Sequence, residues 1–279
     1  IYYIIPYTEF CFWAFHSIPL LYLSILTPVA IFFIVNFIIT NRQATHPIVH
    51  FHTLFSKKPF VGATMAISSH LTLLTGIAGI NVYIVRILKL PFDISLHFYF
   101  FFFVGVIITG ILKMFFYSSV GAGFLGTLGS SALLYVSIHW IILGNTINIP
   151  LLYIQGLLLG FGASMTLVSG SMATLLDGDL KEAAQRSQTM HTIRNFSAAM
   201  LIPIIAYTIK NHIQKGTQSI YAENITDKMI YLKKLQDVAI DADHQIFLLM
   251  IIFNMVMFVS SIIQMILGKG RRITPPRES

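Results

Sequence analysis

The chain has 279 residues, of which 56% are hydrophobic and only 10% are charged, with a formal net charge of +7. Soluble domains carry about 25% charged residues, so the composition excludes an ordinary soluble protein and indicates an all-α polytopic membrane protein. The positive charge does not indicate nucleic-acid binding, because basic patches interleaved with aromatic residues are absent and membrane proteins collect lysine and arginine in cytoplasmic loops. The single cysteine, Cys11, excludes an intrachain disulfide and a cysteine-based metal site.

Seven apolar stretches are each long enough to cross a bilayer as a helix, which requires about 20 residues. In chain order they are residues 12–39, 60–88, 96–117, 120–143, 149–176, 187–209 and 246–267. Pro19 and Pro28 interrupt the first stretch, and a long basic loop follows it. We therefore expect this span to pack outside a compact bundle of the other six. None of the seven spans contains an aspartate or a glutamate.

The beginning of the chain is apolar, starts at Ile1 instead of Met, and lacks the basic segment that opens a signal peptide. We therefore expect the natural N-terminus to be missing from this sequence.

The basic residues outside the spans predict the orientation of the chain. They gather in the loops around Lys57 and Lys181 and in the tail from Lys269 to Arg277, which fall on one side if the spans alternate. The positive-inside rule then places the C-terminus in the cytoplasm. On the opposite side, residues 210–245 form a long loop with five lysines and five acidic residues. In this loop the recurrence of Met229, Leu232, Leu235 and Ala239 predicts a short amphipathic helix on the outer surface.

The span 149–176 has no charged residue and carries three glycines, Gly156, Gly160 and Gly162. Small residues allow neighbouring helices to approach closely in a membrane. We expect these glycines to pack the span tightly against the next one, residues 187–209.

The span 187–209 contains one arginine, Arg194, which shares a helix face with Ser187 and His191. A charge below the membrane surface is costly and usually faces protein or water. One interpretation is that Arg194 points into the bundle and binds an anionic group or a carboxylate. The other is that its long side chain reaches back to the inner surface of the membrane.

The span 60–88 has two polar faces. One face is a stripe of small polar residues comprising Thr64, Ser68, Thr72, Thr75 and Gly79; the other carries His70 and Asn81. The stripe either lines a cavity or serves in helix packing. Likewise His70 is either a titratable group in a cavity or a histidine satisfied in the core, and the second is the simpler interpretation.

Three further sets of residues have simpler explanations than a functional site. We expect His139 and Trp140 to anchor the outer end of their span at the interface, and Lys113 to meet the inner headgroups. The nearby His46, His50 and His52 lack carboxylate or thiolate company, so we expect no metal site. The sequence suggests no cofactor.

The segment GLLLGFGAS (Gly156–Ser164), the short acidic loop after it and the arginine of HTIRNFSAA resemble the C-terminal half of the major facilitator superfamily. The likeness is to the fourteen-span drug:proton antiporter branch. His46-Pro47-Ile48 and Pro59-Phe60 resemble the connection into its last six helices. The arginine usual near the start of the glycine-rich span appears here as Gln155.

The resemblance implies a linker helix and loop at residues 1–59, a six-helix C-terminal bundle at 60–268 and a basic cytoplasmic tail at 269–279. It also implies an exporter of drugs or small amphipathic molecules that works by alternating access in the bacterial inner membrane. The partners would be the lipid bilayer, a missing N-terminal half, the substrate and protons. Substrate or proton coupling would involve Arg194, His191, His70, Asn81 and Gln155. The acid that proton coupling needs would then lie in the missing half.

An alternative is a complete seven-span membrane enzyme or sensor. A membrane enzyme needs histidines or acids clustered at one depth of the membrane. The histidines of this chain are spread over both sides and several depths, which favours the transporter over the enzyme.

Overall fold

The computed structural model describes residues 31–32, 35–41, 43–44, 51–176, 180–222 and 228–268. The chain divides into two units, Ile1–His50 and Phe51–Ser279. In the first unit residues 35–41 are helical, and the Thr40 hydroxyl donates to the Asn36 amide oxygen over 3.5 Å. Most of the expected span 12–39 lies outside the described residues, as do His46, His50 and the tail 269–279.

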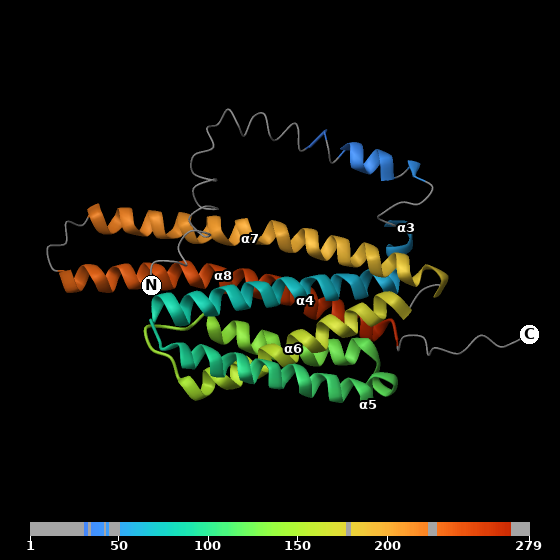
Figure 1. Ribbon diagram of the computed structural model, residues 1–279, viewed down its shortest axis with the longest axis horizontal. Coiled ribbons are helices and arrows are strands. Elements are labelled where there is room, and N and C mark those ends of the chain that lie inside the picture. The colour runs from blue at the N-terminus through green and yellow to red at the C-terminus, as the bar shows by residue number, and fades with distance from the viewer. Residues whose placement is uncertain are drawn as a thin grey trace, which may run out of the picture. The chain divides into compact units, whose positions relative to one another are not determined.

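The described part of the second unit is helical and contains no strand (Figure 1). Its elements are α3 (Phe51–Leu54), α4 (Lys57–Asn81), the π-helix η1 (Val82–Ile87), α5 (Phe92–Trp140), α6 (Ile149–Leu176), the 3₁₀ turn η2 (Leu180–Glu182), α7 (Ala183–Ala222) and α8 (Lys228–Ile266). Five helical segments among the described residues are long and apolar enough to cross a membrane, which agrees with the expected class of protein. The count of seven spans is not confirmed, because most of the first expected span lies outside the described residues.

Helix α5 combines the two expected spans 96–117 and 120–143 in one helical hairpin. A straight helix of its 49 residues would be about 70 Å long, more than twice the hydrocarbon thickness. Instead the backbone breaks at Gly121, where φ is 81° and ψ is 171°, a conformation essentially restricted to glycine. As a result Phe98 and Trp140, near opposite ends of α5, lie with ring centroids 6.4 Å apart. Each half of α5 therefore has about the length of one membrane crossing.

The glycines of α6 lie at close helix contacts, but their partner is α5. A Cβ on Gly160 would lie 2.0 Å from the Phe102 carbonyl oxygen, and one on Gly156 would lie 2.8 Å from that of Phe98. Gly162 faces the second half of α5, where its Cβ would lie 2.6 Å from the Gly129 carbonyl oxygen. The expectation that these glycines pack against 187–209 is thus wrong. The two halves of α5 pack against the glycines of α6 instead.

Most of the polar stripe of α4 is part of the packed core. Thr72 and Thr75 are fully buried. They share a helix face with Gly76 and Gly79, which lie against Met250 and Phe247 of α8. The helix-packing interpretation of the stripe is therefore the one that fits the structure.

The segment 210–245 is helical over most of its length, where the sequence predicted a loop carrying one short helix. Helix α7 has 40 residues and α8 has 39, so each is about 60 Å long. They extend side by side beyond the other helices at one end of the bundle (Figure 1), here called the hairpin end. The pair is tightly packed there, since a Cβ on Gly216 would lie 2.5 Å from a Val238 methyl carbon. Of the charged residues that suggested a loop, Lys215, Lys233 and Asp241 are exposed on this pair, whereas Asp243 is buried.

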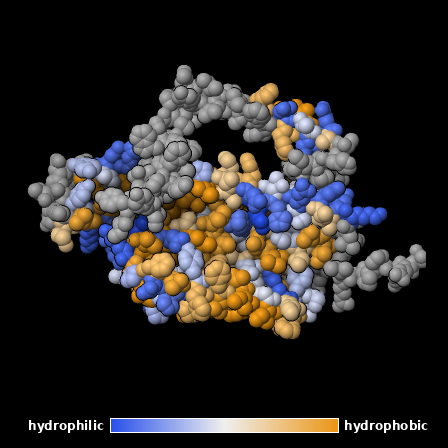
Figure 2. Space-filling view, viewed as in Figure 1, coloured by the Kyte–Doolittle hydropathy of each residue, from blue (hydrophilic) through white to orange (hydrophobic). Residues whose placement is uncertain are grey.

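Apolar side chains cover much of the bundle surface seen in Figure 2. Large exposed residues include Phe100, Phe103, Ile107 and Phe115 on the first half of α5 and Phe196, Ile202 and Tyr207 on α7. Exposed apolar side chains of this size favour contact with lipid or with other membrane helices over contact with water.

Candidate functional site

Arg194, His191 and His70 come together on the surface between α4 and α7. All three side chains are half-buried. The Arg194 guanidinium lies within electrostatic range of both imidazoles. The two helices approach because Ala63 and Ala66 of α4 pack with Met190 of α7. The structure thus joins three of the five residues that the sequence nominated.

The Arg194 cluster, as these three residues are called below, is purely basic. The Nε atom of Arg194 is buried and has no hydrogen-bond partner. Within the described part of the chain the ion pair that forms is between Arg186 and Glu182, and no carboxylate pairs with Arg194. A half-buried guanidinium without an anion is costly in a membrane protein, so the cluster is suited to receive one.

Asn81 and Gln155 do not join the Arg194 cluster. The Asn81 side-chain oxygen accepts a hydrogen bond of 2.8 Å from the Tyr99 hydroxyl, which ties α4 to α5. Gln155 is 1% exposed, and its Oε1 accepts a 2.8 Å bond from Trp140 Nε1. Both amides therefore hold helices together.

Trp140 lies in the core, which corrects its expected place at the membrane interface. Its side chain is fully buried between Phe98 and Phe247, with the Phe247 ring centroid 5.4 Å away. The hydrogen bond to Gln155 satisfies the indole N–H inside the bundle, so the residue needs no contact with headgroups.

Lys113 also differs from expectation. Its ammonium donates a 2.8 Å hydrogen bond to the carbonyl oxygen of Ser164, in the middle of α6. The side chain runs along the contact between the two helices and does not extend from the end of its span. Lysine stems commonly bury against apolar surface in this way, but the charged head here ends on a helix carbonyl.

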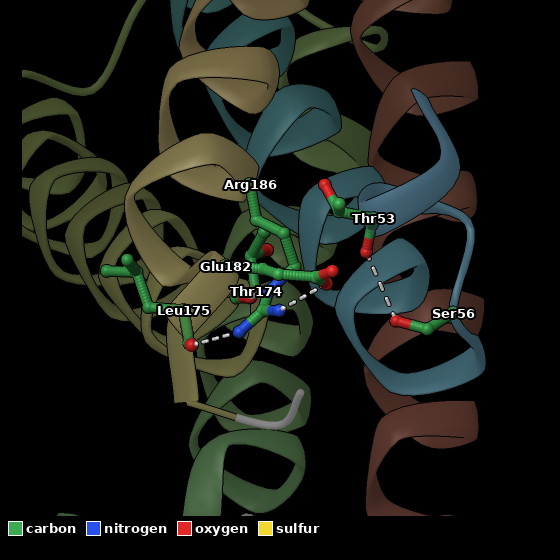
Figure 3. A network of polar contacts seen from close by, with 6 residues as sticks. All are labelled: Thr53, Ser56, Thr174, Leu175, Glu182 and Arg186. Carbon is green, nitrogen blue, oxygen red and sulfur yellow. Dashed lines mark hydrogen bonds and ion pairs between the residues drawn. The ribbon is translucent and has the colours of Figure 1, made fainter. Parts of the chain in front are cut away.

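Arg186 belongs to the basic segment around Lys181, which the sequence predicts to be a loop, but its side chain is buried. It is 1% exposed and donates to the carbonyl oxygens of Thr174 (2.9 Å) and Leu175 (2.8 Å) in the last turn of α6 (Figure 3). Glu182 pairs with it over 3.7 Å. The last carbonyls of a helix lack partners within the helix, so Arg186 caps α6 and fixes the start of α7. An arginine ten residues beyond the end of the span 149–176 was the available signal.

Arg194 follows Arg186 by eight residues of α7 and so lies about 12 Å further along the helix. Arg186 is bonded to helix carbonyls and has a structural role. Arg194 Nε has no such partner, which makes Arg194 the candidate for binding.

Together these features define a multi-pass helical membrane protein that carries a basic cluster on one helix pair. No protein-family model matches the chain, and none of the curated proteins compared with it matches either.

Proposed function

We propose that the chain is the C-terminal portion of a secondary active transporter that exports small amphipathic molecules by alternating access. The observation that carries the proposal is the Arg194 cluster, a half-buried guanidinium with no carboxylate partner in the described part of the chain. Charged residues within membrane spans commonly mark substrate or ion pathways. Transporters place such groups where two helical halves meet, near the middle of the bilayer.

The helical arrangement supports this proposal. Four apolar segments plus the hairpin α5 give a bundle in which α7 and the first half of α5 keep broad apolar surfaces exposed. A second helical half covering the α4–α7 side would bring an anionic group to Arg194. This group would be a carboxylate of that half or of the substrate.

Substitution of Arg194 in the full-length protein tests the proposal. We expect Arg194→Ala to abolish efflux of a fluorescent amphipathic substrate while the protein stays in the membrane. Arg194→Lys should restore only part of the efflux, because lysine keeps the charge and loses the bidentate geometry of the guanidinium.

Arg86, which is exposed in η1, supplies the control. Arg86→Ala removes an equal charge from the same protein and should leave efflux near the wild-type rate. Wild-type efflux by Arg194→Ala would show that the side chain only reaches back to the membrane surface, and would remove the site on which the proposal rests.

A further inference from the structure

A buried carboxyl group lies in α8, outside the span that hydropathy predicted. Asp243 is 1% exposed, and neither carboxylate oxygen has a hydrogen-bond partner. Its neighbours in the helix, Ala242, Ile246 and Phe247, are buried as well. Asp241, two residues earlier, is exposed. Asp243 therefore faces the packed interior.

The surroundings of Asp243 come from three elements at the hairpin end. Tyr83 of η1 is fully buried and lies within electrostatic range of Asp243. Its hydroxyl donates to the carbonyl oxygen of Gly144, in the turn that follows α5. His244 Nε2 donates to the Leu143 carbonyl oxygen in the same turn over 2.8 Å. The carboxyl group thus lies where η1, this turn and α8 meet.

The charged and titratable groups nearby do not compensate an ionised Asp243. Arg86 of η1 is exposed, and His139 of α5 lies beside Tyr135 with ring centroids 6.2 Å apart. From α7, the contact of Gly216 with Val238 sets an antiparallel register that brings the half-buried Lys210 and His212 to about the levels of His244 and Ala242. On α8 itself, Asp237 accepts a hydrogen bond from Asn145, and His244 is held by the turn. The described residues form no ion pair with Asp243.

We propose that Asp243 is a reversible proton-binding site of the bundle. An ionised carboxylate with no partner is strongly disfavoured in an apolar interior, whereas the neutral acid is tolerated. The acid gains an O–H donor and the anion gains acceptors, so the two forms prefer different neighbours. On loss of the proton, the Tyr83 hydroxyl is the donor placed to turn from Gly144 toward the anion. That movement would release the bond between η1 and the turn.

The irregular backbone of η1 suits such a rearrangement. The π-helix η1 directly follows α4, and single π-helical turns in α-helices are frequent at functional sites. If the proposed transport function holds, Asp243 provides within this chain the acid that proton coupling requires. The assignment of the proton to transport rests on that function, but proton binding itself does not.

Infrared spectroscopy of the purified full-length protein in lipid nanodiscs tests proton binding. We expect a carboxylic-acid C=O band that is present at acidic and neutral pH and is lost at alkaline pH. Asp243→Asn should abolish the band, and the exposed control Asp241→Asn should retain it. If Asp243→Asn does not fold, ¹³C-aspartate labelling of the wild-type protein must shift the band. Absence of a pH-sensitive aspartate band would overturn the proposal.

Two further outcomes distinguish proton binding at Asp243 from metal-cation binding and from transport. Loss of the band on adding sodium ions at constant pH would mean that the carboxylate takes a metal cation, which overturns the proton assignment. Transport in proteoliposomes is scored separately. A titrating band with no efflux under any condition contradicts only the transporter function, and wild-type efflux without a band contradicts only the proton site.

Discussion

At the scale of single residues, the bundle buries polar groups that a sequence places at membrane surfaces. Trp140, Lys113 and Arg186 all lie near expected span ends, and each is drawn inward by a specific acceptor. Residue type predicts the amphipathic character of such side chains. It does not predict the acceptor, which comes from another helix. The Arg194 cluster was partly predictable, because helical spacing puts His191 and Arg194 on one face.

Asp243 was missed for a related reason. Its charge ended the predicted span at Ile246, although the helix continues through it from Lys228. A hydropathy criterion excludes a charged residue such as Asp243 from a predicted span, whether or not the fold buries it. Asp243 is a charged residue in a packed interior, and positions where a residue contradicts its surroundings in this way are expected at functional or strained sites.

The role assigned to Arg186 leads to a prediction about stability. Arg186→Ala removes two charge-assisted hydrogen bonds to the end of α6, and we expect a loss of about 3 kcal/mol in stability. Thermal unfolding in detergent would measure it. Glu182→Gln should cost much less, because Glu182 is 43% exposed and pairs at 3.7 Å. Equal losses from both variants would mean that the ion pair, and not the helix cap, stabilises this corner.

At the scale of secondary-structure elements, the positions of the membrane helices were largely predictable. The predicted span 149–176 coincides with α6, and α4 with η1 covers the predicted span 60–88. Helix partners were not predictable, because a glycine marks a close contact without naming the helix that makes it. The break at Gly121 also follows from tertiary packing: α5 must fold back so that both halves contact α6.

Gly160 provides the prediction at this scale. Gly160→Leu would force side-chain atoms into the Phe102 carbonyl, so the two backbones must separate. Overpacking of this kind costs about 1–3 kcal/mol or more, and we expect reduced yield of folded protein and a lower unfolding temperature. Size-exclusion chromatography and thermal unfolding would follow both.

A matched control lies at Gly110 of α5, where an added Cβ meets nothing within 4 Å. Gly110→Leu adds the same side chain to a membrane helix and should leave folding near normal. Comparable damage from the two substitutions would show that the close α5–α6 contact at Gly160 is not what limits stability.

At the scale of the whole molecule, the described part of the second unit combines a membrane bundle with a long helical pair, α7–α8. The pair continues past the bundle at the hairpin end, while the start of α7 lies at the opposite end. The proposed proton site lies at the base of the pair, where α8 enters the bundle beside η1. A rearrangement there would act on the α7–α8 pair, which continues past the bundle.

Helix α8 also makes the orientation of the chain testable. The apolar segment 246–266 lies between Met229, which is 76% exposed, and the basic tail. If this segment crosses the bilayer once, positions 229 and 279 must lie on opposite sides. The positive-inside rule assigns the tail to the cytoplasm, because Lys269, Arg271 and Arg272 follow the helix directly.

Cysteine labelling in intact cells decides this orientation. In a Cys11→Ser background, a cysteine introduced at Met229 should react with an impermeant maleimide, whereas one at Ser279 should react only after permeabilisation. Labelling of the Ser279 variant alone would invert the predicted topology. Labelling of both in intact cells would mean that α8 does not cross the membrane. In that case Asp243 could not carry a proton within a transmembrane bundle, since the helix that holds it would lie on one side of the bilayer.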